Sequence, residues 1–290
     1  MSLNHAKTAV VTGAGSGIGR AIALALARRG YEVGAVDIDM DAARETVGIA
    51  TRAGGSGEAY RCDVSDFEQV STMSDHFFDA WREVGLLVNN AGIGGAGCVG
   101  ETGIDDWHRV VGVNLWGVLY GCHAFVPRMK AAGRGHVVNT ASIAGLFPVM
   151  GFGPYNTSKA AVVSLSETLA VELAPFNIGV TVLCPSMVPT NILGNSLKAL
   201  SIDSYEGGEW EAELIYTGLS HSKLTPDDVA RMVLEAVEKD RLFVVTNLSS
   251  RMNWLYVRFF TATYFRSMAF LNRKGWARGL LLWATRRGLA

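Results

Sequence analysis

Ala9-Val-Val-Thr-Gly-Ala-Gly-Ser-Gly-Ile-Gly19 joins a short apolar run to an Ala/Leu-rich segment that ends at Gly30. The apolar run predicts a buried strand, and the segment from Ile18 to Arg29 predicts a helix, with the glycines in the turn between them. Glycines let the backbone approach a pyrophosphate, and the helix N-terminus offers unpaired N–H groups and a partial positive charge. The stretch therefore predicts a dinucleotide site, although a tight turn without a ligand is the simpler alternative.

A carboxylate, Asp37, follows the second expected strand, 18 residues after the last glycine of this turn. It can accept hydrogen bonds from the ribose hydroxyls of an adenosine, whereas a 2′-phosphate would meet its negative charge. Ser16 and Ile38 occupy the natural places for a compensating base, and both are uncharged. Arg20 or Arg44 could still reach across. We therefore expect NAD, with NADP less favoured, while Asp37 could also be only a turn former at the strand end.

Short apolar segments alternate with helical patterns along most of the chain. This alternation predicts a Rossmann-like doubly wound parallel sheet, an α/β fold with helices on both faces of a single domain. We expect strands at residues 9–12, 32–36, 59–62, 86–88, 136–140, 180–183 and 242–246, and helices at 18–29, 40–53, 66–83, 104–130, 155–175 and from 225 onward. Asp66 is expected to cap its helix, and Thr225 to cap another, with Pro226 and Asp228 behind it.

The domain organisation follows from where strands and helices are predicted to alternate. Residues 1–248 are expected to form the nucleotide-binding catalytic domain, since the hydrophobic fraction of 49% is ample for one large core. Residues 186–224 have mixed character and no clear period, which favours a substrate loop or lid. Residues 249–290 are expected to form a helical extension.

The spacing of the cysteines and of the apolar residues indicates whether a metal site, a signal region or a membrane span is expected. The four cysteines are widely separated and show no ligand spacing, so we expect neither a disulfide framework nor a metal site. The N-terminus lacks an apolar signal region, and no run of about eighteen apolar residues occurs, which disfavours secretion and a membrane span. The expected location is the cytoplasm.

Tyr155-Asn-Thr-Ser-Lys159 places a phenol and an ammonium four residues apart, and Ser142 comes thirteen residues before the tyrosine. Residues four apart lie on one face of a helix, so both groups would point into the same space. A neighbouring cation favours the phenolate, and a shift of about three pKa units, about 4 kcal/mol, would make Tyr155 a base near neutral pH. The spacing alone also fits a surface tyrosine beside a solvated lysine.

Together these motifs resemble the short-chain dehydrogenase/reductase family, in its shorter single-domain branch. The resemblance runs from about Lys7 to Thr246. It rests on Thr12-Gly-x-x-x-Gly-x-Gly19, Asp63-Val64, Asn89-Asn-Ala-Gly92, Asn114, Ser142 and Tyr155-x-x-x-Lys159, in the family's order and spacing. The family's extended branch fits poorly, because its glycine motif is spaced differently and its substrate domain is longer.

The resemblance implies a catalytic set of four residues. Tyr155 would be the acid/base, and Lys159 would lower its pKa and bind the nicotinamide ribose. Ser142 would orient and polarise the substrate oxygen, and Asn114 would hold a water in a proton relay.

The resemblance also implies contacts to the cofactor beyond the glycine turn. Asp63 and Val64 look like the pair that contacts adenine, Asn90 like a backbone support near the ribose, and Thr190 like the hydroxyl that holds the carboxamide. The full set expected at the cofactor is Gly13, Ser16, Gly17, Ile18, Gly19, Asp37, Asp63, Val64, Asn90, Tyr155, Lys159, Pro185, Val188 and Thr190.

One segment departs from the family pattern. Where the family usually has Pro-Gly-x-Val-x-Thr, this chain has Pro185-Ser-Met-Val-Pro-Thr190. Ser186 replaces the glycine and Pro189 stiffens the segment, which makes the contact from Thr190 less secure. Ser186 could add a hydrogen bond near the substrate, or it could be a tolerated replacement.

The implied reaction is hydride transfer between NAD and a secondary alcohol or its ketone, with Tyr155 moving the proton and no metal needed. The segment from Ile143 to Phe152 is almost wholly apolar, as are Met187, Ile192, Leu193, Leu197 and Leu200 in the later segment. A pocket lined in this way favours a hydrophobic alcohol or ketone, unless these side chains pack beneath the loop. The particular substrate and the direction of the reaction stay open.

The end of the chain is basic and aromatic. From Arg241 onward there are nine Lys/Arg and no Asp/Glu. Arg251, Arg258, Arg266 and Arg273 would fall in one narrow stripe of a basic amphipathic helix or helix pair, with bulky apolar residues covering the remainder. The extension could lie on a membrane surface. It could instead pack on its own domain or on a sister subunit, with its arginines facing the acidic remainder of the chain, which has 27 Asp/Glu and 17 Lys/Arg before Arg241. Nucleic-acid binding is not expected, because the basic residues alternate with bulky apolar ones.

Two other classes of function stay open: a nucleotide-binding scaffold without catalysis, and a peripheral membrane protein that acts through residues 250–290. The complete catalytic set argues against the scaffold, since a binding module needs no acid/base group. The resemblance also implies a homo-oligomer, a dimer or tetramer built through the longest helices.

Overall fold

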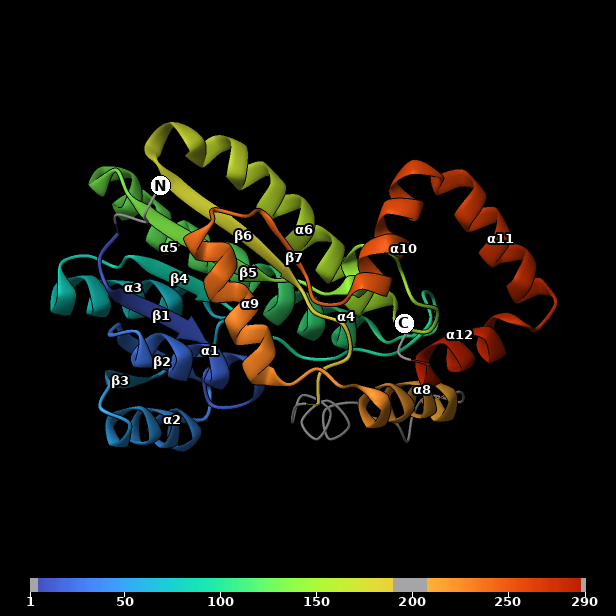
Figure 1. The fold of residues 1–290 in the computed structure, drawn as a ribbon, viewed down its shortest axis with the longest axis horizontal. Coiled ribbons are helices and arrows are strands. Elements are labelled where there is room, and N and C mark those ends of the chain that lie inside the picture. Colours follow the sequence, from blue (N-terminus) through green and yellow to red (C-terminus); the bar gives the residue numbers. More distant parts are fainter. Residues whose placement is uncertain (1–4, 190–207, 288–290) are drawn as a thin grey trace.

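The computed structural model describes residues 5–189 and 208–287. Seven parallel strands form one sheet in the order β3-β2-β1-β4-β5-β6-β7 (Figure 1). The strands are β1 (Thr8–Thr12), β2 (Glu32–Asp37), β3 (Ser56–Arg61), β4 (Leu86–Asn89), β5 (Gly135–Thr140), β6 (Ile178–Cys184) and β7 (Phe243–Val245). The strand order reverses between β1 and β4, and ligands of such sheets bind beyond the carboxyl ends of the strands at this reversal. The predicted doubly wound parallel sheet is confirmed.

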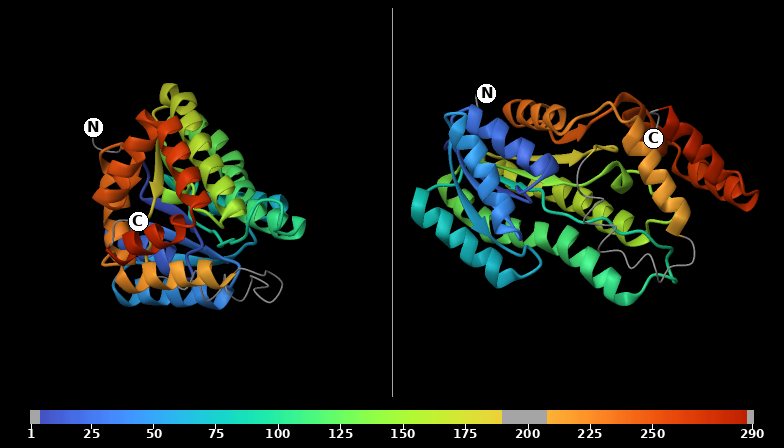
Figure 2. Two further views of the ribbon diagram at one scale, coloured as in Figure 1. Left: turned by 90° about the vertical axis from the view of Figure 1, so that its right-hand side faces the viewer. Right: turned by 90° about the horizontal axis from the view of Figure 1, so that it is seen from below.

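Helices cover both faces of the sheet (Figure 2). They are α1 (Gly17–Arg28), α2 (Met40–Arg52), α3 (Phe67–Trp81), α4 (Ile104–Val111), α5 (Gly117–Ala132), α6 (Gly153–Leu173), α8 (Gly208–His221) and α9 (Pro226–Glu238). One apolar cluster joins α1, α2 and α9 to one face, and a second joins α3, α5 and α6 to the other. The strands are therefore buried on both faces, which is why they are continuous apolar runs such as Val10-Val11.

Two predicted helix caps are present. The Asp66 carboxylate accepts hydrogen bonds from the backbone N–H groups of Glu68 and Gln69. Thr225 and Asp228 form a reciprocal capping box, with Pro226 at the first helical position. Each cap satisfies N–H groups that the first turn of a helix leaves unpaired.

The helix expected at residues 104–130 is continuous from α4 through a π-helical turn (Gly112–Trp116) into α5. By length and composition, Ile104–Ala132 is the one helix in the described ranges that could cross a membrane. Its inner face packs on the sheet and on α3 and α6, and it buries Asn114 completely. A core helix of this kind passes the same length and composition test.

Residues 208–221 form α8, although the sequence shows no clear period there. The predicted substrate segment therefore ends in a regular helix rather than in an irregular loop. Residues 190–207, which include Thr190, lie outside the described residues.

The chain ends in three helices, α10 (Leu248–Phe259), α11 (Thr261–Arg273) and α12 (Ala277–Arg286). The prediction of one stripe of four arginines is wrong. Phe260 has non-helical backbone angles (φ −124°, ψ 40°) and breaks the helix between Arg258 and Arg266. In Figure 1, α11 projects at one end of the molecule, away from the sheet.

Candidate active site

The glycine turn between β1 and α1 is closely packed from both sides. Gly13 has a φ of +66°, and a Cβ there would lie 2.8 Å from the Cα of Ala91. A Cβ on Gly19 would collide with the carbonyl oxygen of Gly13. Only glycine fits at either position, so the turn leaves a cradle of bare backbone at the start of α1. A pyrophosphate fits such a cradle, where backbone N–H groups and the helix dipole favour an anion.

Thr12 and Asn90 hold this turn against the end of β4. The Thr12 hydroxyl accepts hydrogen bonds from the backbone N–H groups of Asn90 (3.0 Å) and Ala91 (3.1 Å). The Asn90 side-chain amide donates to the carbonyl oxygens of Thr12 (3.1 Å) and Gly13 (3.4 Å). Asn90 thus occupies the supporting position that the resemblance implies. No pattern in the sequence indicates that Thr12 is the central acceptor of these hydrogen bonds.

Asp37 lies at the end of β2 and contacts the glycine turn directly. One carboxylate oxygen accepts from Gly15 N (2.8 Å) and the other from Asp39 N (3.0 Å). Asp37 therefore faces the turn, where the ribose of a dinucleotide would lie beside it.

The bases near Asp37 have other partners. Arg20 donates to Glu45 (2.6 Å), to the Thr46 hydroxyl (3.0 Å) and to the Gly15 carbonyl oxygen. Arg44 is exposed and pairs with Asp41 on its own helix (3.3 Å). Arg61, which sequence reasoning did not consider, donates to the Ile38 carbonyl oxygen (3.3 Å).

Asp63 and Val64 follow β3, as expected for residues near an adenine. The Asp63 carboxylate accepts from the backbone N–H (2.9 Å) and hydroxyl (2.7 Å) of Ser65. Val64 is buried against Gly117, where a Cβ would approach it within 2.8 Å. Both residues thus fix the local turn, and this turn ends beside β2 at the same edge of the sheet as Asp37.

The four predicted catalytic residues come from three parts of the chain that meet beyond β4 and β5. Ser142 follows β5, Tyr155 and Lys159 lie on α6, and Asn114 lies in the π-helical turn. Lys159 is buried, and its ammonium donates to the Thr140 carbonyl oxygen (2.9 Å). The Lys159 nitrogen lies 5.8 Å from the centre of the Tyr155 ring. The structure therefore brings these groups together.

Asn114 is anchored on every side. Its amide donates to the Ile93 carbonyl oxygen (2.9 Å) and the Ser158 hydroxyl (3.2 Å), and its oxygen accepts from Ile93 N (2.8 Å). A Cβ on Gly92 would lie 3.1 Å from Asn114 Oδ1 and 3.3 Å from Lys159 Nζ, so both side chains face the Gly92 backbone. π-Helical turns are frequent at functional sites, because the extra residue redirects a side chain.

The protonation of the site differs from the expectation in one respect. Burial raises the pKa of Tyr155, and a hydrogen bond with Ser142 lowers it in part. Burial also lowers the pKa of Lys159 to about 8. The expected lowering of the Tyr155 pKa by Lys159 is not seen, because the ammonium is directed to Thr140 and the apolar surroundings disfavour both charged forms.

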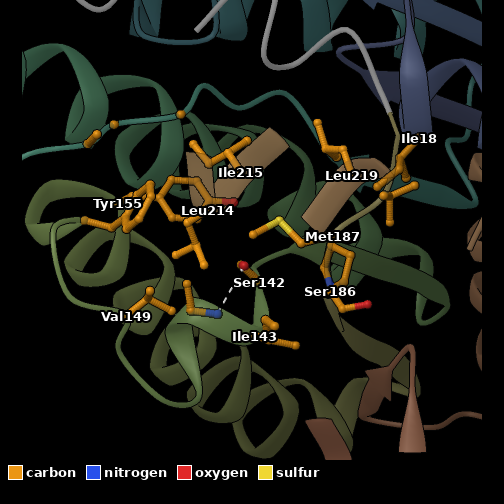
Figure 3. A pocket seen from close by; sticks show the side chains of 17 residues that line it. Ile18, Ser142, Ile143, Val149, Tyr155, Ser186, Met187, Leu214, Ile215 and Leu219 are labelled. Atoms are coloured by element: carbon orange, nitrogen blue, oxygen red, sulfur yellow. Dashed lines mark hydrogen bonds between the residues drawn. The ribbon is translucent and has the colours of Figure 1, made fainter. Parts of the chain in front are cut away.

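An apolar cavity of about 180 Å³ opens beside Ser142 and Tyr155. Figure 3 shows Ser142 near its middle, with Tyr155 and Val149 on one side and Met187 and Ser186 on the other. Its walls are Ile18, Gly94, Gly95, Ala96, Ser142, Ile143, Ala144, Val149, Phe152, Tyr155, Pro185, Ser186, Met187, Val188, Leu214, Ile215 and Leu219. The hydroxyl groups among them belong to Ser142, Tyr155 and Ser186.

Two segments outside the motifs complete this cavity. Pro185 to Val188 lead out of β6, and α8 supplies Leu214, Ile215 and Leu219. The Ser186 hydroxyl lies 3.2 Å from the Thr246 hydroxyl, and Ser186 N donates to the same atom (2.9 Å). The replacement of the family's glycine thus links the cavity wall to the end of β7. The sequence indicated an apolar pocket, but nothing in its pattern identified α8 as a wall.

A buried polar network beneath the site was not anticipated. Asn89 donates to Asn139 (2.9 Å), which donates to the Ser166 hydroxyl (3.1 Å). The polar network ties β4, β5 and α6 together, which fixes the elements that carry the site.

Cys184 lies buried at the end of β6, and burial raises the pKa of its thiol to about 12, so it stays neutral.

A comparison with protein families identifies this architecture. Residues 7–200 match the model of the short chain dehydrogenase family. The chain is a short-chain dehydrogenase/reductase. Sequence and structure therefore agree on the family that the motifs resemble.

Curated relatives and solved structures support the same assignment. EphD of Mycobacterium tuberculosis, described as an oxidoreductase, is 37% identical over 235 residues, and the chain spans only 39% of its length. The oxidoreductase SadH of the same species is 33% identical and covers 93% of this chain and 96% of its own. Cyclohexanol dehydrogenase of Acinetobacter is 33% identical, with coverage of 82% and 90%. A Burkholderia phymatum short-chain dehydrogenase solved with NAD has a TM-score of 0.81 at 35% identity, covering 89% and 95%.

Proposed function

We propose that this chain is an NAD-dependent oxidoreductase that interconverts a hydrophobic secondary alcohol and its ketone. The observation that carries the proposal is that Ser142 and Tyr155 line one cavity whose other walls, apart from Ser186, are apolar. An apolar cavity positions a hydrophobic substrate, and two hydroxyl groups can bind and protonate its single oxygen. The similarity to cyclohexanol dehydrogenase supports a secondary alcohol of this kind.

The residues divide the chemistry between them. A bound nicotinamide dinucleotide would accept or supply the hydride. Tyr155 takes the proton of the alcohol hydroxyl during oxidation and returns it to the ketone oxygen during reduction. Ser142 donates a hydrogen bond to that oxygen. Because burial raises the Tyr155 pKa, the residue is a ready acid, and reduction needs no prior ionisation.

Lys159 and Asn114 support the chemistry of Tyr155 without contacting the substrate. The Lys159 ammonium lies close enough to the phenol to stabilise developing negative charge, and the Thr140 carbonyl oxygen holds it in place. Asn114 fixes the Gly92–Ile93 backbone beside the ammonium, where a water could carry protons outward.

The preference for NAD is supported by the surroundings of Asp37. Its carboxylate faces the glycine turn, and Arg20 and Arg44 already pair with Glu45 and Asp41. A 2′-phosphate would therefore meet the Asp37 charge without a free base from either arginine. Among solved relatives, one contains NAD and others contain NADP or NADPH, so the proposed preference rests on the surroundings of Asp37.

Two further assignments belong to this proposal: location in the cytoplasm and assembly as a homo-oligomer. The outer surfaces of the long helices support assembly, because Trp116, beside α5, and Val171, on α6, are exposed. Sedimentation velocity of the purified chain tests the assembly, and a monomer would refute it.

The reaction is tested by a screen of cyclic and long-chain secondary alcohols, with NAD⁺ and NADP⁺ in parallel. We expect NAD⁺-dependent turnover of hydrophobic alcohols and a loss of at least about a hundredfold in Tyr155→Phe. Tyr216→Phe is the matched control, because Tyr216 is exposed on α8. Full activity of Tyr155→Phe would disprove the assigned mechanism.

A further inference from the structure

The outward face of α10 carries an exposed apolar stripe. Its members follow one another at spacings of four, three and four, which places them on one face of the helix. Their side chains are between 42 and 77% exposed, and they are Leu248, Met252, Leu255 and Phe259, here called the α10 stripe. A contiguous exposed apolar face of this kind marks an interaction surface.

Packing on the protein's own domain uses the opposite face of the same helix. Val257 is buried in a cluster with Ile143 and Phe147. Trp254 packs against Phe243 of β7, with ring centres 4.7 Å apart. The rest of the domain thus covers one apolar face of α10 and leaves the α10 stripe exposed.

A second exposed stripe lies on and just before α12. Trp276, Leu280 and Trp283 are exposed at spacings of four and three. Arg287 lies over the Trp283 ring, 4.6 Å from its centre. Between the two stripes, α11 buries none of its thirteen residues.

The charge of this region has one sign. From Arg251 to Arg287 there are eight Lys/Arg and no Asp/Glu, and all eight basic residues are exposed. Within the described residues, only Arg258 with Glu167 (3.5 Å) and Arg286 with Glu213 (3.6 Å) form ion pairs. Most of the positive charge therefore faces solvent beside the exposed aromatic side chains.

We propose that α10, α11 and α12 dock this protein on the surface of an anionic lipid bilayer. Aromatic and aliphatic side chains that enter the headgroup region, flanked by arginines, are the chemistry that binds helices in the plane of a membrane. Acidic headgroups complement the positive charge, and each nearby Lys or Arg strengthens binding about fivefold.

A second copy of the chain fits this surface less well than an anionic bilayer does. A symmetric pair presents the same patch on both partners, so each copy would bring eight positive residues against eight. Like charges at such an interface oppose association. A bilayer of acidic lipids meets both the apolar stripes and the arginines without this repulsion.

The surface is connected to the cavity of the active site. Ile143 lines the cavity and also belongs to the cluster that holds Val257 of α10. Figure 1 places α10, α11 and α12 at the same end of the molecule as α8, which lines the cavity. Docking would thus hold the cavity near the bilayer. The docking surface itself does not depend on the proposed reaction.

The test is flotation of the full chain with two kinds of vesicle, pure phosphatidylcholine and an equal mixture with phosphatidylglycerol. We expect at least tenfold tighter binding to the anionic vesicles, weakened by added salt. Met252→Ser/Phe259→Ser should lower binding at least tenfold, and Arg251→Ser/Arg266→Ser should weaken binding to the anionic vesicles about 25-fold. Matched controls are Ile104→Ser, exposed on α4, and Arg52→Ser, exposed on α2 at the other end of the molecule. Both controls should bind like the wild type.

Three results would overturn the proposal: no flotation of the wild type with anionic vesicles, equal binding to both vesicles, or equal loss in the controls. Sedimentation velocity on the same variants tests whether a second copy of the chain binds this surface instead. Dissociation of an oligomer by Met252→Ser/Phe259→Ser, without an effect on flotation, would assign the stripe to a second copy. NAD⁺-dependent turnover of a water-soluble alcohol should be unchanged in these variants, so failure of docking and failure of the proposed reaction are distinguishable.

Discussion

The ammonium of Lys159 donates a hydrogen bond to the carbonyl oxygen of Thr140, the last residue of β5, across 2.9 Å. The strand therefore fixes the position of the one cation that faces Tyr155 among the described residues. Both groups are enclosed by apolar walls, and burial lowers the pKa of Lys159 to about 8 while it raises that of Tyr155. The phenol is therefore protonated at neutral pH, and the ammonium lies close to it.

Replacement of Lys159 by Met should lower kcat by about a thousandfold, within the range for loss of acid–base assistance. The Thr140 carbonyl oxygen loses its donor, and Tyr155 loses the cation that stabilises its anion. Steady-state kinetics measure the effect, and a thermal melt separates it from unfolding. Lys239→Met, at an exposed ion pair at the C-terminal end of α9, should keep full activity. A loss of less than tenfold in the folded Lys159→Met would contradict the role of Lys159.

The pair Asp37→Ser/Ile38→Arg should move the cofactor preference toward NADP⁺. The change removes the carboxylate at the expected ribose position and adds a base next to it, so we expect the NADP⁺/NAD⁺ ratio of kcat/KM to rise by about a hundredfold. Asp41→Ser, on the exposed face of α2, is the matched control and should leave the ratio unchanged. An unchanged ratio in the double variant would refute the assignment of Asp37.

Ile215→Asn should raise the KM for hydrophobic alcohols about tenfold and change kcat little. The Ile215 side chain lines the cavity, and about 1.4 kcal/mol of lost apolar contact corresponds to this factor. Tyr216→Asn, at the next position but exposed, should behave like the wild type. Equal kinetics for both variants would mean that α8 does not contact the substrate.

Acid should destabilise the fold through His136. This ring is fully buried beneath Thr181, and burial lowers its pKa from 6.5 to about 3. Below pH 6.5 the unfolded chain binds a proton that the folded chain does not, so the free energy of unfolding falls as the pH drops from 6.5 toward 3. The contribution between pH 7 and pH 5 is about 2 kcal/mol.

Urea denaturation at pH 7 and pH 5 measures this contribution. The difference between the two pH values should shrink in His136→Gln, which removes the titrating group. It should persist in His123→Gln, where the ring is exposed. The same pH dependence in both variants would assign acid sensitivity to other groups.

The fold and the reacting groups could be predicted from local patterns. The apolar run Val10-Val11 and the glycines after it fix a strand, a turn and a helix, because only glycine fits where Gly13 meets Ala91. Asp66 and Thr225 mark the starts of their helices, because their side chains cap the first turn. The Tyr155/Lys159 spacing works in the same way, since four residues make about one helical turn.

Other parts of the site depend on contacts between distant segments. Nothing local marks Thr12 as the acceptor for two N–H groups just after β4, or Leu214 as a wall of the cavity. The Tyr155 pKa is a further case. The sequence places a cation near the phenol, but the direction of the shift depends on burial, which only the packed structure determines.

The sequence by itself determined the order of the strands and the glycine turn, and it predicts which groups react, because these depend on residues a few positions apart. Only the tertiary structure decided where those groups meet and what surrounds them. It also separated the two apolar faces of α10, since periodicity cannot tell a face that packs on Ile143 from one that stays exposed. That distinction depends on which surfaces the rest of the chain covers, and it requires the whole fold.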